Sequence, residues 1–514
     1  MTRAAWACVL LLVAGCGTSY TPDPETGPPS APLASVYDLT IQVPDLSFPL
    51  LSASGLLVDL TVSIDPDSLD SSGSFDAALT VRSVDVGGMP RLFAAADPLA
   101  AHGRAAGRDW LLESFGPIEV GSDSTGRTLV MLSVNGTVSA DGRTIQGAAT
   151  VTSSGETGTF TAVKQRRYLV AATDFGVTGT VSVVTVRYDT QVEVARDLES
   201  ISGDPVARAS EGGVFVVNRF FFDNVQALDP ANGFRTSLQF STGNGSNPHD
   251  ALAVDAQRLF VTRYEAPFND VLIASRSTGE TLGFVDLKPL ATNASGTPRA
   301  DSLALAEGLV FVSLQNIDGS FVEYGPGLVA AIDPSTGTIR TAITLQGRNP
   351  FGPPARHPVS GDLYYACAGI FQGRLPGELS GGIEEVDPRN LTTRGLVVDD
   401  DALGGNVSAV ALSRVPAGVA GHALVTFPDG VNALRAFDPD TGAVAPFPVY
   451  QSHAFLTEAV ADGDGFVLVP EHDPQRPRLL IVEAATGRIV AAPSLSLPPF
   501  SVAVLTRELP RAAE

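Results

Sequence analysis

The sequence predicts an all-β protein with more than one domain, and three observations support this prediction. The chain has 514 residues, of which 44% are hydrophobic, so it exceeds the size of one ordinary core. Its 51 glycines and 37 prolines indicate many turns. Between these turns lie short runs of apolar and β-branched residues, which are typical of strands. Many short strands separated by tight turns define the all-β class.

The stretch at 250–287 shows how the strands are grouped. It contains four strand-like runs, ALAV, RLFVTRY, DVLIAS and TLGFVDL, with turn residues between them. Four consecutive antiparallel strands form a meander that cannot bury both of its faces alone. The stretch therefore requires copies of itself on either side.

Copies of this unit recur through the second part of the chain. Each ends in an Asp-Pro or Thr-Gly turn, where Asp caps the turn, Pro presets φ and Gly takes the left-handed position. The spacing is about 45 to 55 residues, which suits a four-stranded blade. The turns end at Pro230, Gly279, Gly337, Pro388, Gly442 and Gly487, and a degenerate first copy ends at Asp189. Seven such copies predict a seven-bladed β-propeller over residues 167–510.

The two ends of the repeat region predict how the ring closes. The run at 168–173 begins where a second strand belongs, with no innermost strand before it. The run at 500–505 follows the last copy as an unassigned strand. We expect this C-terminal strand to complete the first blade, because that pairing leaves no sheet edge open.

These turns resemble those of the YVTN/YncE-like family of seven-bladed propellers. The resemblance includes Asn247-Pro248-His249-Asp250, which leads into a Leu-Phe-Val-Thr-Arg strand, and it covers roughly two-thirds of the chain. It implies the fold but hardly any function, because propellers host enzymes, carriers and scaffolds alike.

Residues 36–166 form a separate predicted unit of antiparallel strands. Its strand-like runs lie at 57–64, 75–84, 129–135, 144–152 and 157–163. The alternation of apolar and polar residues resembles that of small antiparallel barrel or sandwich modules at the front of bacterial surface lipoproteins. We expect one short helix within residues 92–115.

The N-terminus resembles a bacterial lipoprotein signal peptide. A basic start precedes an apolar run that is too short to span a bilayer, and Leu12-Val13-Ala14-Gly15-Cys16 matches the lipobox of that class. The resemblance implies cleavage of residues 1–15 and a lipid on Cys16, with 16–35 as a flexible tether to the membrane. Gly17 in place of Asp favours the outer membrane of a Gram-negative cell envelope. A plain secretory signal that happens to contain Cys16 is the alternative.

Charge and cysteine content narrow the classes further. Lys and Arg number 33 against 56 Asp and Glu, a net charge of -23, which argues against nucleic-acid binding because phosphate backbones need a basic face. Cys8 leaves with the signal and Cys16 takes the lipid, so Cys367 remains and no internal disulfide is expected. Cys367 lies in an apolar run, which predicts a buried strand residue.

No catalytic signature stands out in the sequence. It lacks G-x-S-x-G, H-E-x-x-H, P-loop and C-x-x-C strings. Trp6 and Trp110 lie outside the repeats, unlike the tryptophan-rich blades of quinone-dependent propeller enzymes. A non-enzymatic protein is therefore favoured, and no cofactor is expected unless Ca²⁺ binds as described below.

Propeller geometry selects the candidate ligand-binding residues. Loops that enter innermost strands and loops that join second to third strands emerge on one face, around the channel mouth. Those loops carry His249, Asp250, Arg263, Asp301, Arg219, Asn218, Glu471 and His472, with Asp174, Gln315, Asn316 and His453 on the same face. Such side chains could hold a cation or an anionic ligand. A solvated polar rim, in which Asp only caps backbone amides, is the competing interpretation.

Two functions from different classes fit these features. The first is a binding scaffold, a surface or periplasmic lipoprotein whose propeller holds a protein, glycan or small ligand. The second is a metal-dependent, lactonase-like hydrolase with Asp250, Asp301 and a neighbouring carboxylate around one Ca²⁺. Arg219 and Arg263 beside those carboxylates would oppose a cation, which favours the binding scaffold.

Overall fold

The computed structural model describes most of the chain. The described residues are 36–48, 53–64, 74–86, 89–92, 98–106, 109–122, 126–139, 143–187, 191–210, 213–370 and 380–505. The predicted signal peptide, Cys16 and the tether lie outside them. No helix in this part of the chain is long and apolar enough to span a membrane. The described residues divide into two compact units, one with 36–167 and 185–193 and another with 168–184 and 194–505.

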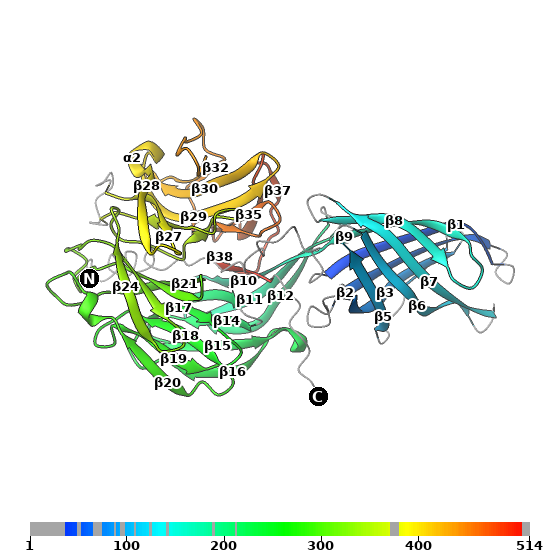
Figure 1. Ribbon diagram of the computed structural model, residues 1–514, viewed down its shortest axis with the longest axis horizontal. Helices are drawn as coiled ribbons and strands as arrows, with labels where there is room; N and C mark the ends of the chain where they lie inside the picture. Colours follow the sequence, from blue (N-terminus) through cyan, green and yellow to red (C-terminus); the bar gives the residue numbers. More distant parts are fainter. Residues whose placement is uncertain are drawn as a thin grey trace. The chain divides into compact units, whose positions relative to one another are not determined.

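The first unit is a closed antiparallel β-barrel. Its strands are β1 (Val36–Phe48), β2 (Ala53–Ile64), β3 (Ser74–Val86), β4 (Met89–Leu92), β5 (Leu99–Ala106), β6 (Asp109–Ser122), β7 (Gly126–Val138), β8 (Thr144–Val151) and β9 (Thr157–Lys164). Eight of them follow the order β2-β1-β9-β8-β7-β6-β5-β3, and β2 pairs with β3 to close the cylinder, while β4 lies beside β3 (Figure 1). Of the two predicted architectures, barrel or sandwich, the structure shows the barrel.

Alternation along the strands fills the barrel with apolar side chains. The buried residues of β2 are Leu56, Val58, Leu60, Val62 and Ile64, and the residues between them are more exposed. Trp110 is 1% exposed and stacks on Phe75, with ring centroids 6.0 Å apart. An eight-stranded barrel has an interior just wide enough for side chains. The interior of this barrel is therefore a packed core.

The prediction of a short helix within residues 92–115 is wrong for the residues that the structure describes there. From Leu99 onward the described residues of this segment form β5 and the first part of β6. Strand β5 pairs with β3 and β6, so these strands bridge the gap between β3 and β7. The alanine-rich local sequence favours a helix, but barrel closure requires strands here, and tertiary pairing overrides local preference.

The second unit is a seven-bladed β-propeller, which confirms the architecture that the repeats predicted (Figure 1). From the innermost strand outward, blade 1 consists of β38 (Pro499–Val504), β10 (Arg166–Thr173), β11 (Thr178–Arg187) and β12 (Gln191–Ser202). Blade 2 consists of β13 (Pro205–Ser210), β14 (Gly213–Asn218), β15 (Asn224–Asp229) and β16 (Arg235–Ser241). Blade 3 consists of β17 (Pro248–Ala253), β18 (Arg258–Arg263), β19 (Asp270–Ser275) and β20 (Thr281–Asp286), and blade 4 of β21 (Ala300–Ala306), β22 (Leu309–Leu314), β23 (Leu328–Asp333) and β24 (Thr338–Thr344).

The remaining three blades follow the same order. Blade 5 is β25 (Ala355–Arg356), β26 (Leu363–Cys367), β27 (Gly382–Asp387), β28 (Thr392–Asp399); blade 6, β29 (Asn406–Val415), β30 (Gly418–Thr426), β31 (Asn432–Phe437), β32 (Tyr450–Ser452); blade 7, β33 (Phe455–Leu456) with β34 (Val460–Ala461), β35 (Phe466–His472), β36 (Arg478–Glu483), β37 (Ile489–Ala491). Short helices η3 (Pro230–Asn232), η4 (Lys288–Leu290) and α2 (Asp400–Leu403) lie in connections.

Strand β38 closes the ring at blade 1. It pairs antiparallel with β10, and Tyr168 lies opposite Val504 while Val170 lies opposite Val502. Phe500 in this strand is fully buried. The innermost strand of the first blade is thus supplied by the C-terminal end of the described chain.

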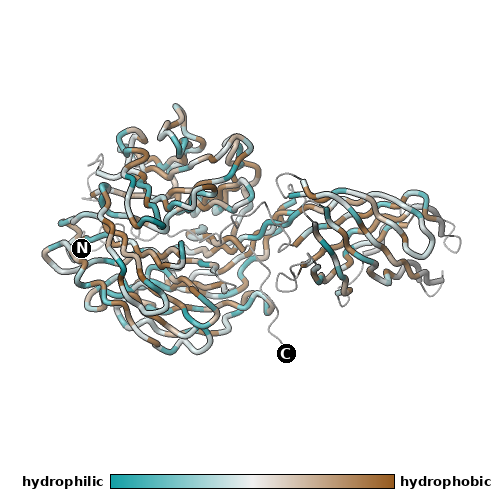
Figure 2. The backbone as a smooth tube through the Cα atoms, in the orientation of Figure 1, coloured by the Kyte–Doolittle hydropathy of each residue, from teal (hydrophilic) through white to brown (hydrophobic). Residues whose placement is uncertain are grey.

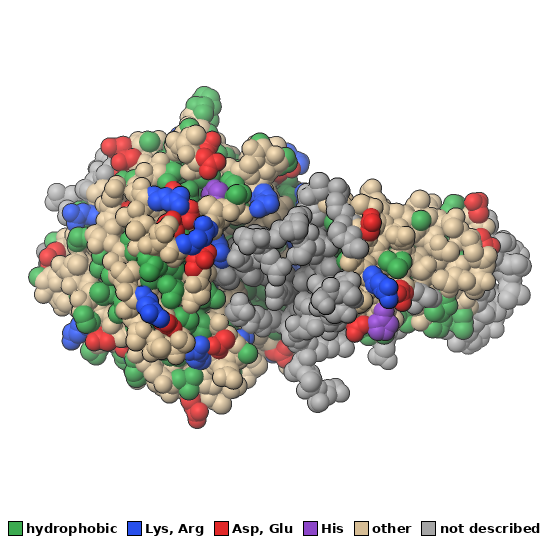
Figure 3. All heavy atoms as spheres, in the orientation of Figure 1, with side chains coloured by type: hydrophobic (Ala, Val, Ile, Leu, Met, Phe, Trp, Pro, Cys, Tyr) green, Lys and Arg blue, Asp and Glu red, His purple; other side chains and the backbone are tan. Residues whose placement is uncertain are grey.

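Apolar side chains pack between neighbouring blades. Phe215 and Val217 of blade 2 share one buried cluster with Leu259 and Val261 of blade 3, and blades 3 and 4 share another. Figure 2 shows hydrophobic segments along the strands of both units. On the side of the molecule drawn in Figure 3, acidic, basic and apolar side chains lie intermixed over the propeller.

One end of the propeller carries the loops that the sequence selected. Because neighbouring strands of a blade are antiparallel, the first and third strands run in the same direction, and the loops that enter them emerge at the same end. We call this end the mouth face. It comprises the loops that enter the innermost strands and the loops between second and third strands, described at 174–177, 219–223, 264–269, 315–327, 427–431 and 473–477.

Candidate functional site

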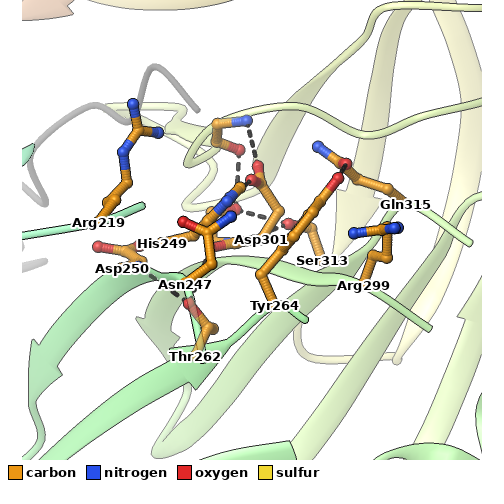
Figure 4. A network of polar contacts seen from close by, with 12 residues as sticks. Arg219, Asn247, His249, Asp250, Thr262, Tyr264, Arg299, Asp301, Ser313 and Gln315 are labelled. Carbon is orange, nitrogen blue, oxygen red and sulfur yellow. Dashed lines mark hydrogen bonds and ion pairs between the residues drawn. The ribbon is translucent and has the colours of Figure 1, made fainter. Parts of the chain in front are cut away.

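A buried polar network lies near the mouth-side ends of the innermost strands (Figure 4). His249 and Asp250 are the second and third residues of β17, and Asp301 is the second residue of β21. Their exposed fractions are 4%, 2% and 3%. The structure therefore brings together three residues that the sequence selected, but it places them inside the protein.

His249 is held by a carboxylate and an aromatic ring. Its Nδ1 donates to Asp301 Oδ1 over 2.7 Å, and its ring stacks on Tyr264 with centroids 3.8 Å apart. The second carboxylate oxygen of Asp301 accepts from Gly352 N at 2.6 Å. Burial lowers the pKa of His249, and the hydrogen bond to Asp301 opposes that shift. The neutral imidazole is therefore favoured at neutral pH.

Tyr264 continues this network. Its hydroxyl donates to Gln315 Oε1 over 2.5 Å, and the guanidinium of Arg299 lies over its ring at 4.7 Å. Arg299 in turn donates to Glu265 at 2.8 Å. The aromatic ring that supports His249 is thus itself fixed by hydrogen bonds and by a cation–π contact.

Asp250 is neutralised by an arginine and by backbone donors. Arg208 of β13 is 4% exposed and donates its Nε–H to Asp250 Oδ1. The same carboxylate accepts from Ala251 N at 2.8 Å and from Leu303 N at 2.7 Å. Two backbone donors and one guanidinium saturate this carboxylate and hold it in one orientation.

Glu458 is a buried acid on the other side of Arg208. It lies between β33 and β34, is fully buried, and its Oε1 is 3.7 Å from Arg208 Nη1. It accepts from Val502 N at 2.7 Å and from the Ser501 hydroxyl at 2.9 Å, and the Ser501 oxygen accepts from Ala207 N at 3.0 Å. Burial raises the pKa of Glu458 to about 8, although Arg208 opposes the shift.

These bonds join one blade to the next around the channel. Glu458 connects blade 7 to blade 1, Ser501 connects blade 1 to blade 2, and Arg208 connects blade 2 to blade 3. Asp250 connects blade 3 to blade 4, and Asp301 connects blade 4 to blade 5. The network therefore holds the innermost strands in register, with every step made by a polar side chain.

Arg219 lies close to this network but is also buried. It is 1% exposed, pairs with Asp204 through its Nη2 and Nε, and lies 5.4 Å from the ring centroid of Phe500. Its positive charge lowers the pKa of His249 slightly, after the effects of burial and Asp301. Arg219 thus adds a buried positive charge near the network.

Two other predicted site residues form ion pairs within their own blades, and Glu471 also bonds to two residues of blade 6. Arg263 donates to both oxygens of Asp270, at 2.7 and 2.6 Å. Glu471 accepts from Arg478, from Tyr450 at 2.6 Å and from Ser452 at 2.7 Å. Burial raises the pKa of Glu471, but these donors outweigh it and the net shift is downward. The structure does not bring Arg263 or Glu471 into the His249 network.

Asn218 and His472 also serve local contacts. The Asn218 amide donates to Asn224 at 2.8 Å and to Gln226 at 2.7 Å. His472 Nε2 donates to the carbonyl of Thr173 over 2.9 Å. Of the other residues considered on this face, Gln315 and Asn316 are buried, whereas Asp174 and His453 are exposed. The predicted lipidation site, Cys16, lies outside the described residues.

No residue of the network belongs to a group with metal-ligand spacing among the residues that the structure describes. Such spacing occurs at 399–401, where three Asp residues offer ligand atoms within 4.8 Å of one another. Two of them serve as caps in the structure. Asp399 accepts from Asp401 N at 2.9 Å, and Asp400 accepts from Gly381 N at 2.8 Å. The predicted Ca²⁺ ligands Asp250 and Asp301 are instead occupied by internal donors.

The sequence reasoning missed the two central members of the network, Arg208 and Glu458. The sequence-based selection was limited to loops. Arg208 instead lies inside β13, the innermost strand of blade 2, and Glu458 lies between β33 and β34, the two short innermost strands of blade 7. A usable signal was present, because charged residues in the apolar runs PVARAS and LTEAVA need a buried partner.

No family model and no curated protein sequence matches the chain. Solved structures with a similar fold include the periplasmic gluconolactonase PpgL of Pseudomonas aeruginosa, at 16% identity over 67% of this chain and 100% of that chain, with a TM-score of 0.45. AztD of Citrobacter koseri is 12% identical over 71% of this chain and 95% of that one, with a TM-score of 0.36. Hydrazine synthase of Kuenenia stuttgartiensis is 11% identical over 63% of this chain and 94% of that one, with a TM-score of 0.38.

The fold defines the class of this protein as a seven-bladed β-propeller that follows a small β-barrel in the sequence. The similarities to solved structures carry no conclusion about its activity. Its function is therefore argued from its own residues.

Proposed function

We propose that this chain is a lipoprotein of the bacterial cell envelope whose propeller is a binding scaffold for a protein, glycan or small ligand. The lipobox ending at Cys16 and the Pro- and Ser-rich tether at 16–35 support the anchor. The propeller supports the proposed role as a binding scaffold, because binding residues commonly lie on loops that a rigid fold holds in place.

The observation that carries the proposal is the saturation of the mouth-side carboxylates. Asp250 is paired with Arg208 and accepts hydrogen bonds from two backbone N–H groups, and Asp301 accepts hydrogen bonds from His249 and from one backbone N–H group. A calcium ion needs six to eight oxygen ligands, and recruiting these two carboxylates would break the bonds that join the blades. This arrangement favours a rigid frame for binding over a metal-dependent hydrolase.

The first test is thermal unfolding with calcium and with EDTA. A ligand at 100 times its Kd adds about 2.7 kcal/mol, which shifts a melt by several degrees. We expect the melting temperature of the purified protein to stay within about 1 °C in millimolar CaCl₂ and in EDTA. A calcium-dependent rise that EDTA reverses, together with lactone hydrolysis, would establish the hydrolase instead.

The second test captures the ligand and examines the anchor. The lipid-free protein at 17–514 is immobilised, exposed to envelope extract and analysed by mass spectrometry for retained proteins, glycans and small molecules. The matched control is a chain that ends at Pro498, whose propeller lacks β38. We expect retention by the complete ring alone. In cells, labelled palmitate should enter the wild type and not Cys16→Ser, whereas a soluble, unlabelled wild type would indicate a plain secretory signal.

A further inference from the structure

The loop at 219–223, between β14 and β15, exposes an unusual group of aromatic side chains. It contains three consecutive phenylalanines, and Phe221 is 83% exposed while Phe222 is 38% exposed. Phe220 lies against Phe221 with ring centroids 4.0 Å apart. The ring of Phe221 therefore gains little burial when the chain folds.

The backbone at Phe221 is also unfavourable for its residue type. Phe222 N donates to Arg219 O at 2.9 Å, which closes a four-residue turn with Phe221 in third place. The φ of Phe221 is 72°, a left-handed value for which this turn position prefers glycine. A bulky side chain costs free energy in this backbone conformation.

The loop is nevertheless held firmly. Phe220 N donates to Asn247 Oδ1 at 3.0 Å. The Asp223 carboxylate accepts from Gly245 N at 2.7 Å and from Asn247 N at 2.8 Å. The buried pair of Arg219 and Asp204 fixes the start of the turn. Phe221 is therefore presented in one geometry, which lowers the entropy cost of binding a partner.

Other loops of the mouth face repeat parts of this arrangement. Phe175 and Phe321 have φ values of 60° and 56°, also in the left-handed region. Val177 is 77% exposed and Val322 is 66% exposed in the same two loops. The loops of blades 1, 2 and 4 thus each contain a phenylalanine with left-handed φ and an exposed apolar side chain, and only in blade 2 is this the same residue, Phe221.

The charge of these loops indicates what they would bind. In the loops at 174–177, 219–223, 264–269 and 315–327, Asp174 and Glu323 are exposed, and Glu265 and Asp318 are partly exposed. The basic side chain of these loops, Arg219, is buried against Asp204. These acidic side chains around the exposed phenylalanine attract cations and repel anionic lipid headgroups.

The protein already contains the contact that such a partner would make. Arg263 pairs with Asp270 and lies 4.3 Å from the ring centroid of Phe268. Arg299 pairs with Glu265 and lies 4.5 Å from the ring centroid of Phe321. In both cases a guanidinium is held between a carboxylate and a phenylalanine face. Phe221 is 83% exposed, and among the described residues no arginine is held between a carboxylate and its ring in this way.

We propose that Val177, Phe221, Phe222 and Val322 form a docking surface for a protein partner that presents arginine together with apolar side chains. This proposal rests on the binding function proposed above and identifies the partner class and the contacting loop. Phe221 is the central contact, because exposed, rigidly held aromatic residues dominate interface energetics.

The test uses a random dodecapeptide phage library panned on the lipid-free protein, with counter-selection on Phe221→Gly. Glycine accepts the left-handed φ, so this variant should fold with an equal or slightly higher melting temperature. We expect the enriched peptides to carry arginine and apolar residues. A synthetic consensus peptide should bind at least tenfold more weakly to Phe221→Gly and to Phe221→Asn, and more weakly to the wild type in 0.5 M NaCl.

The matched control is Phe447→Ala. Phe447 is 80% exposed but lies between β31 and β32, outside the mouth-face loops. Its replacement should leave peptide affinity unchanged. Equal binding to the wild type and Phe221→Gly, an equal loss in Phe447→Ala, or no enrichment at all would overturn the docking surface. Capture of an envelope ligand by both the wild type and Phe221→Gly would leave the scaffold function standing without this surface.

A membrane contact is distinguished by vesicles of phosphatidylethanolamine and phosphatidylglycerol in a 3:1 ratio. We expect no sedimentation of the lipid-free protein with them, because the acidic loops repel phosphatidylglycerol. Binding to these vesicles that Phe221→Gly abolishes would overturn the protein partner in favour of a lipid surface.

Discussion

The barrel and the propeller close their sheets by different means. In the barrel, backbone pairing runs unbroken around the cylinder, and a continuous apolar core fills the inside. In the propeller, each blade is a separate sheet, and blades are joined by apolar side chains and by the polar network of Arg208, Asp250, Asp301 and Glu458. Barrel stability should therefore depend mainly on packed volume, and propeller stability also on charge balance at its centre.

The largest difference should follow from removal of the closing strand. Deleting 499–514 exposes the edge of β10 and removes the buried Phe500 together with the partners of Glu458. We expect the propeller transition in calorimetry to fall by more than about 10 °C or to disappear, while the barrel transition stays in place. A chain that ends at Leu505 keeps β38 and is the control. An unchanged propeller transition would show that β38 does not hold the ring together.

The next effect should come from unbalancing the central charges. Asp250→Ala removes the carboxylate opposite buried Arg208, and breaking a buried ion pair costs about 3 to 5 kcal/mol. Leu60→Ala in the barrel core should cost about 2 to 5 kcal/mol by leaving a cavity. We expect each variant to lower the transition of its own unit in calorimetry.

A double variant sharpens this prediction. Arg208→Met with Asp250→Leu replaces both charges by apolar groups and should regain most of the lost stability, because buried pairs replaced together are often neutral. If the double variant is less stable than Asp250→Ala, the specific hydrogen bonds to Leu303 and Ala251 matter more than the charge balance.

The last effect should be a pH dependence confined to the propeller, which is small over any single pH unit. The folded pKa of Glu458, about 8, is raised above its ordinary value of 4.5, so the folded state binds this proton more tightly than the unfolded chain does. Its contribution to stability is fully present below pH 4.5 and is lost as pH rises through 8, by up to about 1.4 kcal/mol per pH unit. We expect Glu458→Gln to flatten this slope in melts between pH 5 and 8.5. Equal slopes in the wild type and in Glu458→Gln would contradict the assignment.

The architecture was predictable because it repeats. Each Asp-Pro or Thr-Gly turn marks the same place in a blade, so seven weak signals reinforce one another. The segment at 92–115 has no such repetition. Its alanines favoured the prediction of a helix, whereas the structure has β5 and β6, which complete the barrel. A closure that depends on distant strands cannot be read from local composition.

The sequence predicted which residues lie at the mouth face, but it did not predict which side chain each of them contacts. His249 and Asp301 meet because both begin innermost strands of neighbouring blades. Arg263 and Glu471 do not join them, because Arg263 lies directly opposite Asp270 across its hairpin and Glu471 directly opposite Arg478. That cross-strand pairing of opposite charges was visible in the sequence once the hairpins were aligned. The roles of Arg208 and Glu458 depend on the direction of their side chains within the channel, which the sequence does not show.

The position of β38 also sets an order of events during synthesis. The first blade is made early, yet its innermost strand, β38, ends at Val504, so the ring cannot be completed before about 504 residues have been made. Until then β10 has an unpaired edge, and Glu458 lacks the donors that β38 supplies. The ring of the propeller can therefore be completed only after the strands of the barrel, which lie at 36–164, have all been made.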